Sequence, residues 1–243
     1  LRFGNDILRN DLIFNKSTNG EDLVITFKGN NNDSIIIKKQ LEGNNSRIET
    51  ITFDNGNDTI DFTKKTIISN EDTSLQINLD EVEQERVLNQ NITIIAALGS
   101  ANYNESTGLV TYTPTGNWSG VDNITYNIKD NDGNIVRTNT INLLVSPIND
   151  NPFGNTINQE IMVGDEVNIN LADLFSDAEG DNVTLLVNAK NQIGLPGWLN
   201  FDEETGILSG TVNKNGKTII EVTASDENGG IYQTSFNISA NIN

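Results

Sequence analysis

Acidic and amide side chains gather at three places in the second half of the chain: the segment Asn149-Asp150-Asn151, the segment Asp177-Ala178-Glu179-Gly180-Asp181, and Asp226. Calcium prefers about six to eight oxygen ligands from carboxylates, amides and backbone carbonyls, whereas magnesium takes fewer ligands from the protein. If the three places meet, they predict a calcium site. Its expected ligands are the side chains of Asp150, Asp177, Glu179, Asp181 and Asp226, with carbonyl oxygens from Asn149 and Asn151.

The alternative is that these acidic loops are simply solvated and keep a protein with a thin core soluble. A single Asp-x-Asp segment would favour that interpretation, but three such places in one domain favour calcium. Without a cation, like charges would repel one another. A bound ion would become the largest local charge and hold the linker straight, so we expect the rigidity of the joint to depend on calcium.

Composition excludes several classes of chemistry. The 243 residues include 15 Lys and Arg against 34 Asp and Glu, a net charge of −19, with no Cys and no His. Thiol nucleophiles, imidazole acid–base chemistry, thiolate or imidazole metal ligands and disulfides are therefore excluded. Since basic residues do not cluster, nucleic acid is not an expected partner. Cations are the natural partners of such a chain.

Short runs of alternating apolar and polar residues recur along the chain and predict strands. In one of them Ile124, Tyr126 and Ile128 share a face, the period-two pattern of a half-buried strand. Turn signals such as Asn55-Gly56 and Asp132-Gly133 separate the runs and indicate antiparallel pairing. We therefore expect an all-β protein of tandem β-sandwich domains, preceded by a small β-rich domain.

Helix is expected at only two places, over Asp80 to Leu88 and as a single turn over Leu171 to Phe175. A repeated sequence motif indicates the domain boundaries in the rest of the chain. The motif at Ile128 to Gly133 recurs at Ala224 to Gly229, and each copy is followed by a final strand. The predicted domains are residues 1–65, 66–152 and 153–243. The joint Ser146 to Pro152 is too short and too proline-bounded to be a loose tether.

Three parts of the chain resemble known families. Leu195 to Thr211 resembles the hallmark of dystroglycan-type cadherin-like or immunoglobulin-like domains of bacterial surface proteins. Trp118 to Tyr126 resembles the cadherin-like tandem repeats of giant bacterial adhesins. Glu21 to Ile25 and Ile48 to Gly56 resemble the domain that accompanies haemolysin-type (RTX) calcium-binding repeats. The acidic segments of the third domain are similar to cadherin calcium motifs. That likeness implies that Glu71 and Asp122 approach the site from the preceding domain.

The middle domain departs from the cadherin pattern. Where an acidic box is expected after its first strand, the chain has Asp80 to Glu85. The sequence therefore leaves open whether the junction at residues 65 and 66 holds calcium through Asp130 and Asp132.

The resemblances imply a non-enzymatic, calcium-stiffened extender segment of a large bacterial cell-surface or secreted adhesin. The expected location is extracellular or at the cell surface. The expected partners are calcium ions, neighbouring domains of a longer chain, and surface glycans or other cells reached through distal domains. Leu1 in place of Met indicates an excised fragment, and no signal peptide or membrane span is visible.

Two alternatives remain open. One is a carbohydrate-binding accessory module of a secreted polysaccharide-active enzyme, with Trp118 or Trp198 stacking on sugar rings. We favour core packing for both rings, because Trp is usually largely buried. The other is a catalytic fragment that uses a carboxylate pair, as glycoside hydrolases do. Acids are so abundant here that a suitable pair would arise by chance.

Overall fold

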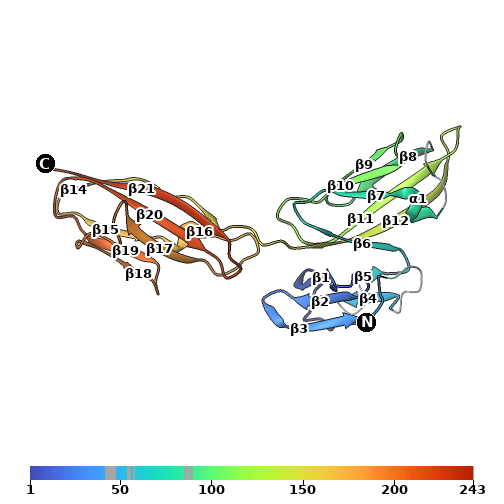
Figure 1. The fold of residues 1–243 in the computed structure, drawn as a ribbon, viewed down its shortest axis with the longest axis horizontal. Helices are drawn as coiled ribbons and strands as arrows, with labels where there is room; N and C mark the ends of the chain where they lie inside the picture. The colour runs from blue at the N-terminus through green and yellow to red at the C-terminus, as the bar shows by residue number, and fades with distance from the viewer. Residues whose placement is uncertain (42–47, 54–55, 57, 85–86, 88–89, 243) are drawn as a thin grey trace. The chain divides into compact units, whose positions relative to one another are not determined.

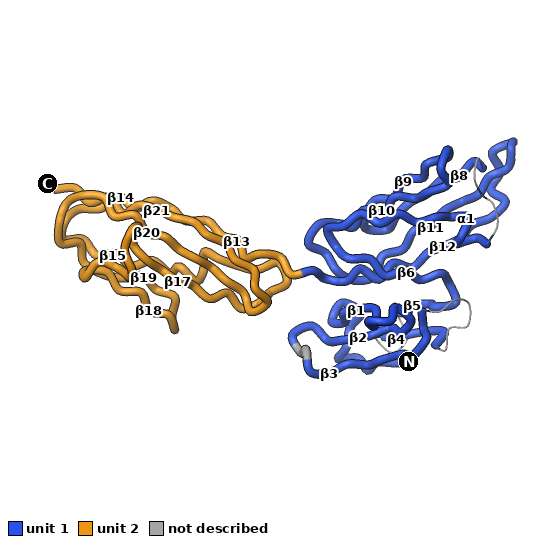
Figure 2. Tube along the Cα trace, viewed as in Figure 1, with its two compact units in different colours: residues 1–148 blue, residues 149–243 orange. Residues whose placement is uncertain are grey.

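The computed structural model describes residues 1–41, 48–53, 56, 58–84, 87 and 90–242. Its elements are almost entirely β-strands, as Figure 1 shows. The chain divides into two compact units, residues 1–148 (unit 1) and residues 149–243 (unit 2), which Figure 2 colours separately. None of the helices in the described part of the chain is long and apolar enough to cross a membrane.

Unit 1 begins with two small sheets. A 3₁₀ turn, η1 (Arg9–Asp11), leads into an antiparallel sheet in the order β1-β2-β3, and a second antiparallel pair follows. On β2, Leu23 and Ile25 are buried while the residues between them are partly exposed, as alternation requires. The strands are β1 (Leu12–Lys16), β2 (Leu23–Phe27), β3 (Asn30–Ile37), β4 (Thr50–Phe53) and β5 (Asp58–Asp61).

The rest of unit 1 is a two-sheet sandwich. One sheet has the order β6-β12-β11-β8 and the other β7-β10-β9, with all neighbours antiparallel except β6 and β12. Ile124, Tyr126 and Ile128 all point into the core between the sheets, which confirms the predicted alternation. The strands are β6 (Lys65–Asn70), β7 (Leu75–Asn78), β8 (Asn91–Ala96), β9 (Ser100–Asn104), β10 (Leu109–Thr113), β11 (Gly120–Lys129) and β12 (Ile135–Ser146).

Strand β12 is buried on both faces. Ile141, Leu143 and Val145 join the core of the sandwich, whereas Leu144 joins a core that also contains Phe14 and Phe53 from the first residues of the chain. A strand covered on both sides is expected to read as a continuous apolar run rather than an alternating one. Because they share this core, residues 1–65 and the sandwich form one compact unit. The division of the chain into three domains stays a prediction.

Unit 2 is a second sandwich. Its sheets have the orders β14-β21-β20-β17 and β15-β19-β18, and a short pair, β13-β16, flanks them. Ile220, Val222 and Ala224 alternate into the core, as the sequence predicts. The elements are β13 (Phe153–Gly154), β14 (Gln159–Met162), β15 (Glu166–Asn170), η3 (Ala172–Leu174), β16 (Phe175–Ser176), β17 (Thr184–Ala189), β18 (Leu199–Asp202), β19 (Ile207–Thr211), β20 (Gly216–Ser225) and β21 (Ile231–Asn241).

Both tryptophans pack against hydrophobic cores, Trp118 in unit 1 and Trp198 in unit 2. Trp118 lies so close to Gly120 that a Cβ at this glycine would approach the ring to 2.8 Å. Both rings are partly buried, which confirms the prediction of core packing in part.

The helical predictions are confirmed in part. Helix α1 (Leu79–Glu83) begins at Asn78, whose side chain accepts a hydrogen bond from the Asp80 amide, and it ends at Gln84 with a φ of 56°. The later positions of the predicted helix, Glu85, Arg86 and Leu88, lie outside the described residues, as does Asn55 of the Asn55-Gly56 turn. The single turn expected over Leu171 to Phe175 is η3.

Candidate metal centre

The three acidic places of the sequence meet at one end of unit 2. The entering segment 149–151, the loop after β16 (residues 177–181) and the turn between β20 and β21 lie together at the end where the chain enters the unit (Figure 1). Sheet topology explains this, because the long β20–β21 hairpin returns its turn to the pole at which residue 149 begins.

Asp226 organises the β20–β21 turn. Its Oδ1 accepts hydrogen bonds from the amides of Asn228 and Gly230, both at 2.8 Å. Its Oδ2 accepts one from the Asn149 side chain at 3.1 Å. Burial opposes ionisation of Asp226, but these donors outweigh it and hold the pKa of the carboxyl below its ordinary value. Asp226 therefore ties the entering segment to the turn as an anion.

The loop after β16 binds the entering segment a second time. Asp177 Oδ1 accepts hydrogen bonds from the amides of Glu179 at 3.0 Å and Asp181 at 3.2 Å, which folds the loop around one carboxylate oxygen. Glu179 Oε2 then accepts the Asp150 amide at 2.9 Å. Asn151 Oδ1 accepts the Ile231 amide at 2.9 Å. Each linker residue from 149 to 151 is thus hydrogen-bonded within unit 2.

Two carboxylate oxygens in this cluster are buried without a hydrogen-bond partner: Asp150 Oδ2 and Asp177 Oδ2. A buried anionic oxygen without a partner is costly, since water has been removed and nothing replaces it. The pKa of nearby Glu179 is raised, first by burial and also by the negative charges of Asp150 and Asp177. The partly buried Glu179 carboxylate is therefore repelled by both neighbouring charges, and a cation would relieve that repulsion.

Two oxygens of the cluster lie close to Gly230. A Cβ built on this buried glycine would lie 2.1 Å from Asp226 Oδ2 and 2.8 Å from the Asp150 carbonyl oxygen. Both oxygens are therefore within 3 Å of one point, and any larger side chain would displace them. Sequence reasoning named neither Gly230 nor the Asp150 carbonyl, although the Gly229-Gly230 pair was the available signal.

Within the described ranges, no three acidic side chains come close enough to hold a metal ion by themselves. Asp181 Oδ2 already accepts a hydrogen bond from the Asn228 side chain. The available oxygens are the unpartnered ones of Asp150 and Asp177, with Glu179 beside them. Such an all-oxygen donor set, completed by backbone carbonyls and water, fits calcium better than metals that prefer nitrogen or sulfur.

The two predicted ligands of unit 1 are engaged inside that unit. Asp122 is fully buried, and its carboxylate accepts four hydrogen bonds, which come from the amides of Leu98 (3.0 Å), Gly99 (2.9 Å) and Asn123 (2.7 Å) and the Tyr112 hydroxyl (2.8 Å). Glu71 is 1% exposed, and its Oε1 accepts the Ile148 amide at 2.9 Å. Asp122 therefore acts as a structural anion, and Glu71 holds the chain where it leaves the sandwich.

The acidic segment that replaces the expected box also has internal roles. Asp80 Oδ1 accepts the Val87 amide at 2.7 Å. Glu83 accepts hydrogen bonds from the Tyr126 hydroxyl, the Asn139 amide at 2.7 Å and Arg137 at 2.6 Å, and this cluster fastens α1 to β11 and β12. Asp130 likewise accepts the amides of its own turn. These carboxylates stabilise the sandwich through hydrogen bonds.

Glu83 should make the stability of unit 1 depend on pH. Burial alone would raise the pKa of its carboxyl, but hydrogen bonds from Tyr126, Asn139 and Arg137 together lower it below the ordinary value. The stabilisation is therefore complete above the unfolded pKa of roughly 4.3 and is lost as pH falls through the folded pKa. Glu83→Gln should cost about 1.5–3 kcal/mol near neutral pH and less in acid, measured by denaturant unfolding from pH 3 to 7. A constant difference between variant and parent across that range would contradict this role.

Three family models match consecutive parts of the chain. Residues 22–57 match the model described as Haemolysin-type calcium binding protein related domain. Residues 55–143 match that of the Bacterial Ig domain, and residues 147–241 match that of the Putative Ig domain. No curated protein matches the chain.

Solved structures show distant similarity only. Mouse clustered PcdhgC3 EC1-3 is 9% identical, covers 73% of this chain and 65% of its own, and has a TM-score of 0.41. A putative alpha-galactosidase from Bacteroides fragilis is 16% identical over 39% of this chain, with a TM-score of 0.31. An endo-fucoidan hydrolase of glycoside hydrolase family 107 is 13% identical over 98% of this chain, with a TM-score of 0.30. The chain spans only 18% and 38% of the lengths of these two enzymes.

The suspected domain families are thus confirmed by the models that match, and the all-β sandwich fold is confirmed by the strands themselves. Along the chain, a part similar to the haemolysin-type calcium-binding-related domain is thus followed by a part similar to bacterial immunoglobulin domains and by a second immunoglobulin-like part.

Proposed function

We propose that the chain is a non-enzymatic spacer segment of a large bacterial surface or secreted adhesin, and that calcium stiffens it at the entrance to unit 2. Bacterial immunoglobulin-like domains are typical of extracellular and surface proteins, and a haemolysin-type calcium-binding-related domain precedes them here. Thin β-sandwich cores and long antiparallel hairpins suit a mechanical role more than a catalytic one.

The observation that carries the proposal is the pair of buried, unpartnered carboxylate oxygens, Asp150 Oδ2 and Asp177 Oδ2. Glu179 lies within reach of both charges and completes an anionic cluster at the base of the linker. A calcium ion here would satisfy the two oxygens and convert repulsion into attraction. We propose Asp150 and Asp177 as the primary ligands. Glu179, Asp181, Asp226 and the oxygens of Asn149 and Asn151 would form the surrounding set and would have to draw closer to the ion on binding.

The hydrogen bonds of the connecting segment support stiffening. Ile148 is held by Glu71 within unit 1, and the next residues, Asn149 and Asp150, are held by Asp226 and Glu179 within unit 2. Each unit thus holds its own end of the connecting segment. Calcium bound to Asp150 would strengthen the second set, because the ion would join the linker to the loop after β16.

Calcium is expected to stabilise unit 2 strongly. Dissociation constants of extracellular calcium modules begin on the order of 0.1 mM. At a calcium concentration of about a hundred times that value, binding would contribute about 2.7 kcal/mol. For a domain of this size, that corresponds to a Tm about 10–20 °C higher than in chelator, measured by scanning calorimetry.

Matched variants give this prediction its control. Asp150→Asn with Asp177→Asn removes both unpartnered anionic oxygens, and the double variant should show less than about a quarter of the parent's calcium response. Glu166→Gln removes an exposed acid on β15, outside the cluster, and should respond like the parent. Parent-like calcium stabilisation in the double variant would rule out this site.

Stiffening itself is tested by small-angle scattering of the full chain in calcium and in chelator. Calcium should narrow the distribution of molecular dimensions in the parent and leave the Asp150→Asn, Asp177→Asn variant unchanged. If the parent binds calcium at this site but scatters identically in both buffers, the proposed calcium site would stand and the proposed stiffening would be wrong.

A further inference from the structure

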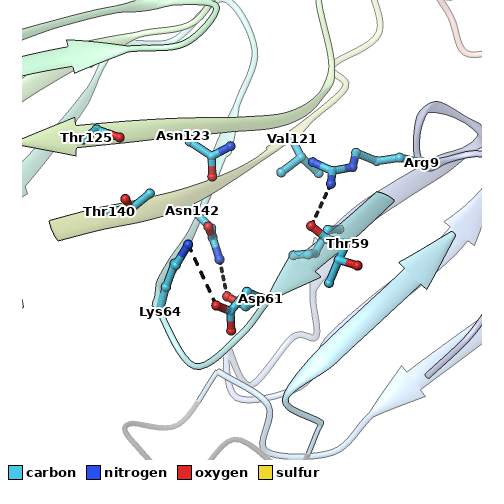
Figure 3. A pocket seen from close by; sticks show the side chains of 10 residues that line it. Arg9, Thr59, Asp61, Lys64, Val121, Asn123, Thr125, Thr140 and Asn142 are labelled. Carbon is cyan, nitrogen blue, oxygen red and sulfur yellow. Dashed lines mark hydrogen bonds and ion pairs between the residues drawn. The ribbon is translucent and has the colours of Figure 1, made fainter. Parts of the chain in front are cut away.

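A groove of about 300 Å³ opens in unit 1 between the turn after β5 and the outer face of strands β11 and β12 (Figure 3). Four polar side chains of these strands line it as two cross-strand pairs, Asn123 opposite Asn142 and Thr125 opposite Thr140. Cross-strand neighbours are about 5 Å apart, and residues two apart on one strand are about 7 Å apart. The array therefore presents hydrogen-bonding groups over roughly the area of one sugar ring.

Asn142 makes one corner of the array rigid. It is 4% exposed, and its Nδ2 donates to the Asp61 carbonyl oxygen at 2.6 Å and to Thr66 Oγ1 at 3.3 Å. Both amide hydrogens are thereby used, which fixes the orientation of the side chain and keeps Oδ1 as an acceptor. A preorganised polar group of this kind is typical of binding sites.

The other three groups keep their hydrogen-bonding capacity. In the described part of the chain, the side chains of Asn123, Thr125 and Thr140 make no hydrogen bond to protein groups. Further along the same sheet face, Thr138 donates to Asn127 Oδ1 at 2.7 Å, so that pair satisfies itself. The side-chain donors and acceptors that have no partner in the protein are thus the ones that line the groove.

Two cations border the same groove in a chain of net charge −19. Arg9 uses Nε and Nη2 to bind the Asp58 carboxylate, and Nη2 also donates to the Thr59 carbonyl at 2.9 Å, which leaves the Nη1 hydrogens for another acceptor. Lys64 Nζ forms a long ion pair with Asp61 Oδ2 at 3.9 Å, and Asp61 also lines the groove. The carboxylates of Asp58 and Asp61 offset part of this positive charge, but the Arg9 Nη1 hydrogens and two Lys64 ammonium hydrogens remain as charged donors beside neutral hydroxyls and amides. Such a set matches a ligand that has both a carboxylate and hydroxyl groups.

We propose that this groove binds one uronic-acid unit of an anionic polysaccharide. Its hydroxyls would bind Asn123, Thr125 and Thr140, and its carboxylate would lie between Arg9 and Lys64. The residues that line the groove include no aromatic ring. Binding would rest on hydrogen bonds and charge, with a dissociation constant on the order of 1 mM. Repeated along a longer protein, such weak sites would add avidity to the mechanical role.

The test is an NMR titration of the full chain with a galacturonate disaccharide, done in chelator so that calcium cannot bridge uronate to the acidic loops. The side-chain amide of Asn123 and the backbone amides of residues 123–125 and 140–142 should shift saturably. A neutral disaccharide should bind about ten-fold more weakly, and Lys64→Gln should reduce uronate affinity towards that of the neutral sugar.

Valine substitutions probe the hydroxyls, since valine keeps the threonine shape. Thr125→Val with Thr140→Val should lower uronate affinity by about ten-fold or more, whereas Thr93→Val, on an exposed position of β8, should leave it unchanged. An unaltered amide spectrum away from the groove will show that each variant is folded. Equal affinity for neutral sugar, parent-like affinity in the double variant, or no shifts at the groove would each overturn the proposal. None of these outcomes depends on the calcium site of unit 2.

Discussion

Replacement of Asp122 with alanine is expected to destabilise unit 1 by about 3–5 kcal/mol, among the largest effects of any single substitution in the chain. The carboxylate is fully buried and accepts hydrogen bonds from three backbone amides and the Tyr112 hydroxyl. Alanine would leave the buried Tyr112 hydroxyl and three partly buried amides without this acceptor. A fully buried unpaired group costs about 1–3 kcal/mol, and water can reach the partly buried amides, so the total stays below four full costs.

The loss of unfolding free energy in unit 1 is measured by equilibrium denaturation, with Trp118 fluorescence as the signal. Trp198 is replaced by Phe in all proteins compared, which removes the signal of unit 2. Tyr112→Phe is the matched control, because it deletes one donor and leaves Asp122 with three, so it should cost only about 1 kcal/mol. If Asp122→Ala were as mild as Tyr112→Phe in the absence of calcium, the structural role assigned to this carboxylate would be wrong.

Leu144→Ala is expected to cost about 2–5 kcal/mol and to loosen the first residues of the chain together with the sandwich. Leu144 is completely buried on the face of β12 that packs against Phe14 and Phe53, opposite the face that builds the sandwich core. A cavity there removes contacts that join the N-terminal sheets to β12. Hydrogen exchange should therefore accelerate in β1, β2 and β12 together.

Leu208→Ala provides the comparison, because Leu208 is equally buried in the core of unit 2. It should accelerate exchange in unit 2 and leave β1 and β2 at the parent rates. Should Leu144→Ala perturb the sandwich while β1 and β2 keep their protection, residues 1–65 would behave as an independent domain, as the predicted boundary implies.

Local pattern in the sequence was sufficient for the fold class and for the meeting of the acidic segments at one end of unit 2. Period-two runs such as Ile124 to Ile128 predicted strands correctly, because burial of one sheet face imposes that alternation on any sequence. The acidic segments around Asp150, Asp177 and Asp226 were predicted to meet, and they do so because strand order alone returns the β20–β21 turn to the end of unit 2 where residue 149 enters.

Tertiary structure decided how each acid is used. Asp122 and Asp150 are the same residue type, yet the Asp122 carboxylate has four donors and Asp150 has a buried oxygen with none. Hydrogen-bond saturation depends on backbone amides brought from distant strands, and local sequence does not encode their position. The groove beside Asn142 likewise exists only because the N-terminal sheets pack on the outer face of β12, a contact made through side chains far apart in the chain.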